Sequence, residues 1–113
     1  MNIEPVIINY LITELGTDNV YGEVPENPEG EYFIVDKTGS DYENRLTSST
    51  IAIQSYASSK YRASELNEQV KAAMDRIIKL RVIDDCQLIS DYNFTNIAKK
   101  EHRYQAVFEV THR

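Results

Sequence analysis

The strongest constraint on the fold is a run of apolar residues with helical spacing between positions 59 and 80. These residues recur at alternating steps of three and four, and charged side chains occupy the remaining faces. Such a pattern predicts a long amphipathic helix that buries one stripe. The stripe consists of Ala63, Leu66, Val70, Ala73, Ile77 and Leu80. Because the pattern ends after about three heptads, we expect the helix to pack on the protein's own sheet rather than in a coiled coil.

A shorter helix is predicted over residues 5–15, where Ile7, Leu11 and Leu15 follow one another at spacings of four. Pro5 fits the first turn of a helix, because no amide donor is needed there. Gly16 follows the last apolar position and is expected to end the helix.

Five further segments have the composition or the alternation of β-strands. They are residues 19–24, 31–37, 50–56, 86–94 and 103–112. In the fourth segment, strict alternation would place Leu88, Ser90, Tyr92 and Phe94 on one side. The first two segments are joined by a turn that contains two prolines and a glycine, and together they predict an antiparallel hairpin.

The order of elements is therefore α-β-β-β-α-β-β. This order predicts an α+β fold, with a mostly antiparallel sheet of four to five strands and two helices packed on one face. A chain of 113 residues, 42% of them hydrophobic, is long enough for one core, so we expect a single domain over residues 1–113. No run approaches the roughly 18 apolar residues of a membrane helix, and the N-terminus lacks the features of a signal peptide, so no membrane partner is expected.

Residues 38–49 are mostly polar and predict a loop of about twelve residues, which is longer than most connections in compact domains. Such a loop is either mobile or occupied by a partner. It contains Tyr42 and Arg45, and Tyr61 lies at the start of the long helix, off its apolar stripe. Tyrosine and arginine are enriched at protein interfaces, so these three residues are candidates for a subunit interface. Partial burial in the core is the alternative for the two tyrosines.

Charge is distributed unevenly along the chain, whose formal net charge is -6. The first 36 residues carry eight carboxylates and no Lys or Arg, whereas the other 77 carry ten acids and twelve bases. A nucleic-acid-binding protein would instead gather its bases on one face. The asymmetry also allows the acidic part of one copy to meet the more basic part of another, although a solvated acidic surface explains it as well.

The sequence holds no recognisable catalytic, cofactor or metal motif. No Gly-rich phosphate cradle is present, and the two histidines stand ten residues apart with no second cysteine to complete a zinc site. Asp84 and Asp85 could suit Mg²⁺, but their place just after the long helix equally fits a turn. The lone Cys86 permits no intrachain disulfide and is expected to be a small buried hydrophobic residue. We therefore expect no catalytic, cofactor-binding or metal residues, and no enzyme.

Several segments carry a resemblance to a known family. They are residues 20–25 (VYGEVP), 32–39 (YFIVDKTG), 51–56 (IAIQSY), 63–70 (ASELNEQV), 90–95 (SDYNFT) and 103–108 (RYQAVF). In this order they resemble the tail terminator, or tail completion, proteins of long-tailed phages and prophages of Gram-positive bacteria. The resemblance covers nearly the whole chain and contains no catalytic motif.

This resemblance implies a structural role in a virion. Such a protein assembles with itself as a ring, expected to be a hexamer, on the end of the finished tail tube. It ends polymerisation of the tail tube protein and presents the tail to the head-tail connector protein. It would be found in the host cytoplasm during assembly and then in the virion tail. The alternatives are a head completion or neck ring protein of the same particle and, less well supported, a small metal-dependent nuclease.

DNA must pass through the channel of any such ring without binding to it. Because basic walls would bind phosphates, the lumen is expected to be acidic or neutral. The candidates for acidic lumen residues lie near the first predicted turn and are Glu23, Glu26, Glu29 and Glu31.

Overall fold

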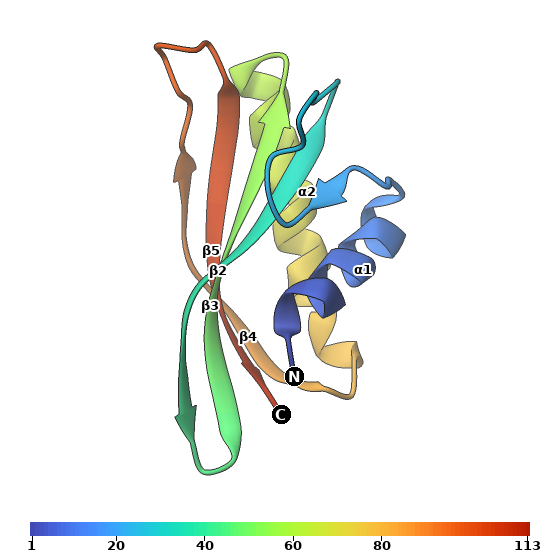
Figure 1. Cartoon of the computed structure of the whole chain (residues 1–113), viewed down its shortest axis with the longest axis vertical. Helices are drawn as coiled ribbons and strands as arrows, with labels where there is room; N and C mark the ends of the chain where they lie inside the picture. The colour runs from blue at the N-terminus through green and yellow to red at the C-terminus, as the bar shows by residue number, and fades with distance from the viewer.

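The computed structural model describes residues 1–113. The elements in chain order are α1 (Ile3–Leu15), β1 (Val20–Tyr21), β2 (Tyr32–Glu43), β3 (Leu46–Ala57), α2 (Lys60–Asp75), the short 3-10 helix η1 (Ile77–Lys79), β4 (Ile83–Asn93) and β5 (His102–His112). The five strands form one mixed sheet in the order β1-β2-β3-β5-β4. Both helices lie on the same side of this sheet (Figure 1). The predicted α+β fold and its element order are confirmed.

The core lies between the helices and the sheet and contains a cluster of 18 buried residues. Ile7 and Leu11 of α1 meet Leu66 and Val70 of α2 there, above strand residues such as Ile51. The two apolar stripes that predicted the helices are therefore the surfaces that they bury. No helix is long and apolar enough to cross a bilayer.

The helix ends show why each helix begins and stops where it does. The side chain of Asn2 accepts a hydrogen bond from the Glu4 amide at the start of α1, and Gly16 closes that helix with a φ of 68°. Ser59 caps α2 in the same way. The prediction that α2 continues to residue 80 was wrong, because the chain tightens into η1 after Asp75. That 3-10 turn leads the chain toward β4 while Ile77 stays fully buried.

The predicted antiparallel hairpin over residues 19–37 was also wrong. The strand β1 has only two residues and pairs with β2 in parallel, with Val20 opposite Phe33. The connection of residues 22–31 is long enough to return the chain to the start of β2. Its prolines and Gly30, which has a φ of 65°, suit an irregular path and not a tight turn.

Residues 38–49 form no loop, which corrects the sequence-based expectation. They form the end of a long β2–β3 hairpin whose two-residue turn is Asn44–Arg45. Both turn residues have positive φ, 51° and 67°, as a type I′ turn requires. The segment is polar because most of its residues are exposed, and its Thr and Ser residues fit a strand. We call residues 38–49 the hairpin arm; it projects beyond the helices at the lower end of the molecule in Figure 1.

A β-bulge changes the faces of β4. The register shifts between Leu88 and Ser90, so that Leu88 pairs with Phe108 on the helix-covered face, whereas Tyr92 pairs with Gln105 on the other face. The prediction that Leu88, Ser90 and Tyr92 share one side was therefore wrong. We call the face of the sheet without helices the open face.

Candidate assembly surfaces

The hairpin arm is paired to β5 at its base and exposed at its tip. Its base is fixed to β5, since the Ser49 hydroxyl lies 2.9 Å from Nε2 of the buried His112. The β3 residue nearest the turn that still pairs with β5 is Thr47, opposite His112. The tip of the arm therefore extends past the end of β5. Tyr42 there is 71% exposed, and Arg45 in the turn forms no ion pair with the rest of the chain.

Two of the three predicted interface residues lie together on this arm. Tyr42 stands on β2 and Arg45 in the turn next to it. Tyr61 is 74% exposed, but it lies in the first turn of α2, at the other end of the molecule from the arm (Figure 1). The structure therefore separates Tyr61 from the other two candidates.

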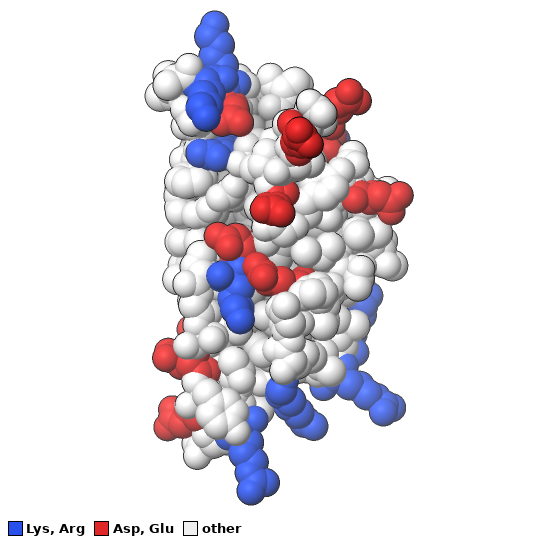
Figure 2. All heavy atoms as spheres, viewed as in Figure 1, with Lys and Arg blue, Asp and Glu red and all other residues white.

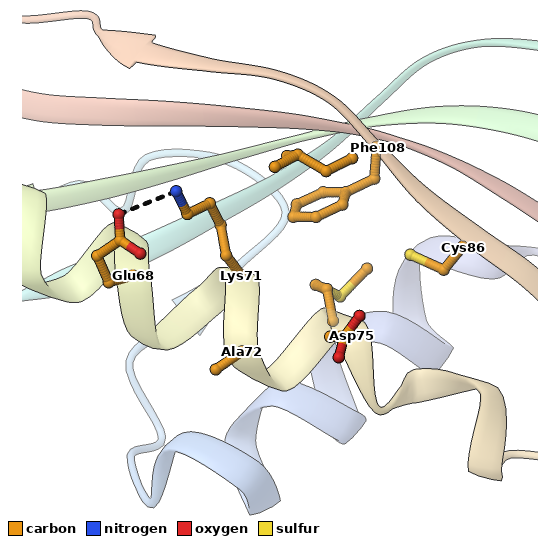
Figure 3. Close-up of a pocket in the computed structure, with 8 residues that line it drawn as sticks. Glu68, Lys71, Ala72, Asp75, Cys86 and Phe108 are labelled. Carbon is orange, nitrogen blue, oxygen red and sulfur yellow. Dashed lines mark ion pairs between the residues drawn. The ribbon is translucent and has the colours of Figure 1, made fainter.

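A groove lies between α2 and the edge strand β4, with a volume of about 380 Å³ (Figure 3). Its floor is apolar and contains the buried Met74 and Phe108. Leu88 forms part of its β4 side and is 46% exposed, although it faces the helix layer. We call this site the α2–β4 groove. The groove was not predicted from the sequence, because its lining residues come from three elements that are far apart in the chain.

Charged side chains of α2 form the rim of the groove. The Lys71 ammonium lies 2.9 Å from the Glu68 carboxylate and 3.4 Å from that of Asp91 on β4. Hydrogen bonding to Glu68 is the main reason that the pKa of Lys71 is raised, and the nearby Asp91 adds to it. Farther along the rim, the exposed Asp75 has no ion-pair partner.

Cys86 lines the groove from β4 and is half-buried, so the expected small buried residue is in fact accessible from one side. Figure 3 shows its sulfur directed from the strand toward α2. Burial raises the pKa of the Cys86 thiol to about 11, and the carboxylates of Asp85 and Asp75 raise it further. The thiol is therefore protonated at neutral pH and poorly suited to nucleophilic chemistry.

Side chains on the open face form a hydrogen-bonded row across the sheet. Arg103 donates to the Tyr56 hydroxyl at 2.8 Å, and that hydroxyl donates to Gln54 at 2.9 Å. The Gln54 amide donates in turn to Gln105, which donates to the Tyr92 hydroxyl. Because each member has a partner, this row stabilises the half of the open face opposite the hairpin arm.

Acids dominate the rest of the open face. Strand register places five exposed carboxylates there, none of which has an ion-pair partner. They are Asp36, Asp41, Glu43, Asp85 and Glu109. Arg103 is the one base on this face, and it is already bonded to Tyr56 and to the Phe94 carbonyl.

The four acids predicted to face a lumen lie in or beside the β1–β2 connection. Glu23, Glu26 and Glu29 are exposed and form no ion pairs. Glu31 differs, because both of its oxygens bond the Arg62 guanidinium, at 2.5 and 3.1 Å. In Figure 2 carboxylates gather at the upper right, where Figure 1 places this connection, and several lysines and arginines stand out at the lower end.

No protein-family model matches the chain, and no curated protein matches its sequence. Its fold is similar to that of a protein chain in the solved structure of the virion of a native gene transfer agent particle. The TM-score is 0.51 at 16% sequence identity, and the likeness covers 90% of this chain and 83% of the other. At this identity the comparison establishes a shared fold and nothing more.

Proposed function

We propose that this protein is a structural component of a phage-like virion, with no enzymatic role. The observation that carries the proposal is the likeness in fold to a chain of the gene transfer agent virion, which extends over 90% of this chain. The sequence resemblance to tail terminator proteins points to the same class of particle. One core cluster joins both helices to all five strands, which supports residues 1–113 acting as a single domain.

Within that class, we propose a tail terminator. The protein forms a ring, expected to be a hexamer, on the end of the tail tube, ends tube polymerisation and presents the tail to the head-tail connector. It would act first in the host cytoplasm and then in the virion tail. A ring of identical subunits needs two different surfaces that meet head to tail. The hairpin arm and the α2–β4 groove are two such surfaces on one chain.

The channel of the ring would be lined by unpaired carboxylates. Glu23, Glu26 and Glu29 remain the first candidates, because they are exposed and free of ion pairs. Glu31 contributes less, since Arg62 neutralises it. The open face is a second acidic surface that could line the channel.

Capping of tail tubes tests this function. Purified protein is added to isolated tail tubes and, separately, to empty heads that carry a portal, and both samples are viewed by electron microscopy. A ring on tube ends, with growth of the tubes stopped, supports the terminator. Binding to heads alone would instead identify a head completion or neck ring protein. Binding to neither would contradict both roles.

A further inference from the structure

We infer that the hairpin arm of one subunit docks into the α2–β4 groove of a second copy of this chain. This inference rests on the proposed ring and names the contact that would build it. Three features of the structure support it: a strained residue at the arm tip, an apolar groove with an unpaired acid, and the placement of the two on opposite sides of the sheet.

Arg45 at the arm tip has a backbone conformation that is unfavourable for a residue other than glycine. Asparagine followed by glycine suits a type I′ turn best, because both central residues have positive φ. Here the second position is Arg45, held at a φ of 67°. A side chain held in a disfavoured backbone conformation, with no partner in its own chain, indicates a contact outside that chain. Tyr42, which is 71% exposed, adds an apolar ring next to this arginine, on the face of the hairpin opposite Leu46.

The groove offers the complementary surface. Its floor of Met74 and Phe108 and its side at Leu88 suit the Tyr42 ring. On its rim, Asp75 is a carboxylate without a partner, just as Arg45 is a guanidinium without one. Docking would pair these two charges and bury the apolar surfaces around them.

The placement of the two surfaces permits a ring. The arm is formed by β2 and β3, whereas the groove follows β4, which is the edge strand on the opposite side of the sheet. The arm of one subunit can therefore enter a neighbour's groove while its own groove receives the arm of another subunit. Contacts of this head-to-tail kind close into rings when the rotation between subunits permits.

Charge reversal tests the predicted pair of Arg45 and Asp75. Each of the single variants Arg45→Glu and Asp75→Arg should raise the concentration needed for assembly roughly tenfold or more, because like charges then face each other. The double variant should assemble again. An equal mixture of the two single variants should also assemble, because in an alternating ring every interface again pairs opposite charges. Arg81→Glu is the matched control, since Arg81 is an exposed base without an ion pair outside the arm, and it should assemble normally.

A disulfide test uses the native Cys86 as the reporter inside the groove. With Arg45→Cys, mild oxidation should give a ladder of covalent oligomers, and mass analysis of peptides should join residue 45 of one copy to Cys86 of another. Adding Cys86→Ser should abolish the ladder, and Glu26→Cys, which places a thiol on the β1–β2 connection, should give none.

The results separate this inference from the proposed function. Rings that form equally well in both single reversal variants, or a cross-link between other positions, would overturn the docking and leave the ring intact. Wild-type protein that stays monomeric at every concentration and never caps a tube would overturn both.

Discussion

The Tyr10 hydroxyl on α1 donates a hydrogen bond to the Ala73 carbonyl oxygen on α2, with 2.6 Å between the two oxygens. This bond links residues 63 positions apart and holds the two helices together over the sheet. The same carbonyl also accepts from the Arg76 amide, so it keeps one partner if the tyrosine hydroxyl is removed. We predict that Tyr10→Phe lowers the free energy of unfolding by about 1 kcal/mol, as for a single hydrogen bond. Denaturant titration measures this, and an unchanged midpoint would show that the bond does not stabilise the helix pair.

Alkaline pH should destabilise the fold through two buried tyrosines. Burial raises the pKa of Tyr10 to about 12, with a further contribution from Glu14. Burial likewise raises the pKa of Tyr32 to about 12, helped by its neighbour Tyr56. Both tyrosines are protonated in the folded and the unfolded chain below pH 10, so their contribution is fully present there. Above pH 10 only the unfolded chain releases these protons, and stability falls as the pH rises toward 12.

Unfolding free energy measured from pH 8 to pH 11 checks this expectation. Tyr10→Phe should reduce the loss between pH 10 and 11, because one of the two buried tyrosine hydroxyls is then absent. A flat profile in the wild-type protein would contradict the proposed burial of both hydroxyls.

Arg45→Gly should have opposite effects on stability and assembly. Glycine adopts the φ of 67° at this position without strain, so the monomer should gain about 1 kcal/mol in free energy of unfolding. Loss of the guanidinium should at the same time weaken ring formation. Thermal unfolding of the monomer and sedimentation of the assembly give the two readings. A variant that is more stable and assembles as well as the wild type would show that the arginine has no role at the interface.

The ring should not retain duplex DNA at moderate salt, because its net charge is -6 per chain. Replacing Glu23, Glu26 and Glu29 by lysine changes the formal charge by about +2 at each site. The three changes together bring the net charge of the chain to zero. If these residues face the channel, the assembled variant should retain duplex DNA in a mobility-shift experiment. The matched control carries three lysines on the open face outside the hairpin arm, at Asp36, Asp85 and Glu109. Retention by the control alone would assign the channel to the open face, and retention by wild-type protein would contradict an acidic channel.

Much of the fold could be predicted because its helices and inner strands bury regular patterns. The stripe from Ala63 to Ile77 and the alternation of Ile51 and Ile53 correspond directly to buried side chains. The errors fall where packing or backbone geometry overrides the pattern. The polar residues of the hairpin arm resembled a loop, because a strand that is exposed on both faces has no apolar alternation. The bulge after Leu88 likewise reversed the faces of the strand beyond it.

The assembly surfaces could be predicted only in part. The choice of Tyr42 and Arg45 as interface residues stays a prediction, and the structure shows only that both lie on the hairpin arm. The groove was not predicted, because it is formed by residues from α2, β4 and β5 that are far apart in the sequence.

Native mass spectrometry of the purified protein, with electron microscopy of the same sample, tests the central claim most directly. The account predicts one closed ring, and for the expected hexamer a mass of about 78 kDa, which is six chains of 13.0 kDa. Arg45→Glu should shift the same sample to single chains. A monomer at every concentration, in the presence and absence of tail tubes, or an open filament in place of a closed ring, would contradict the account.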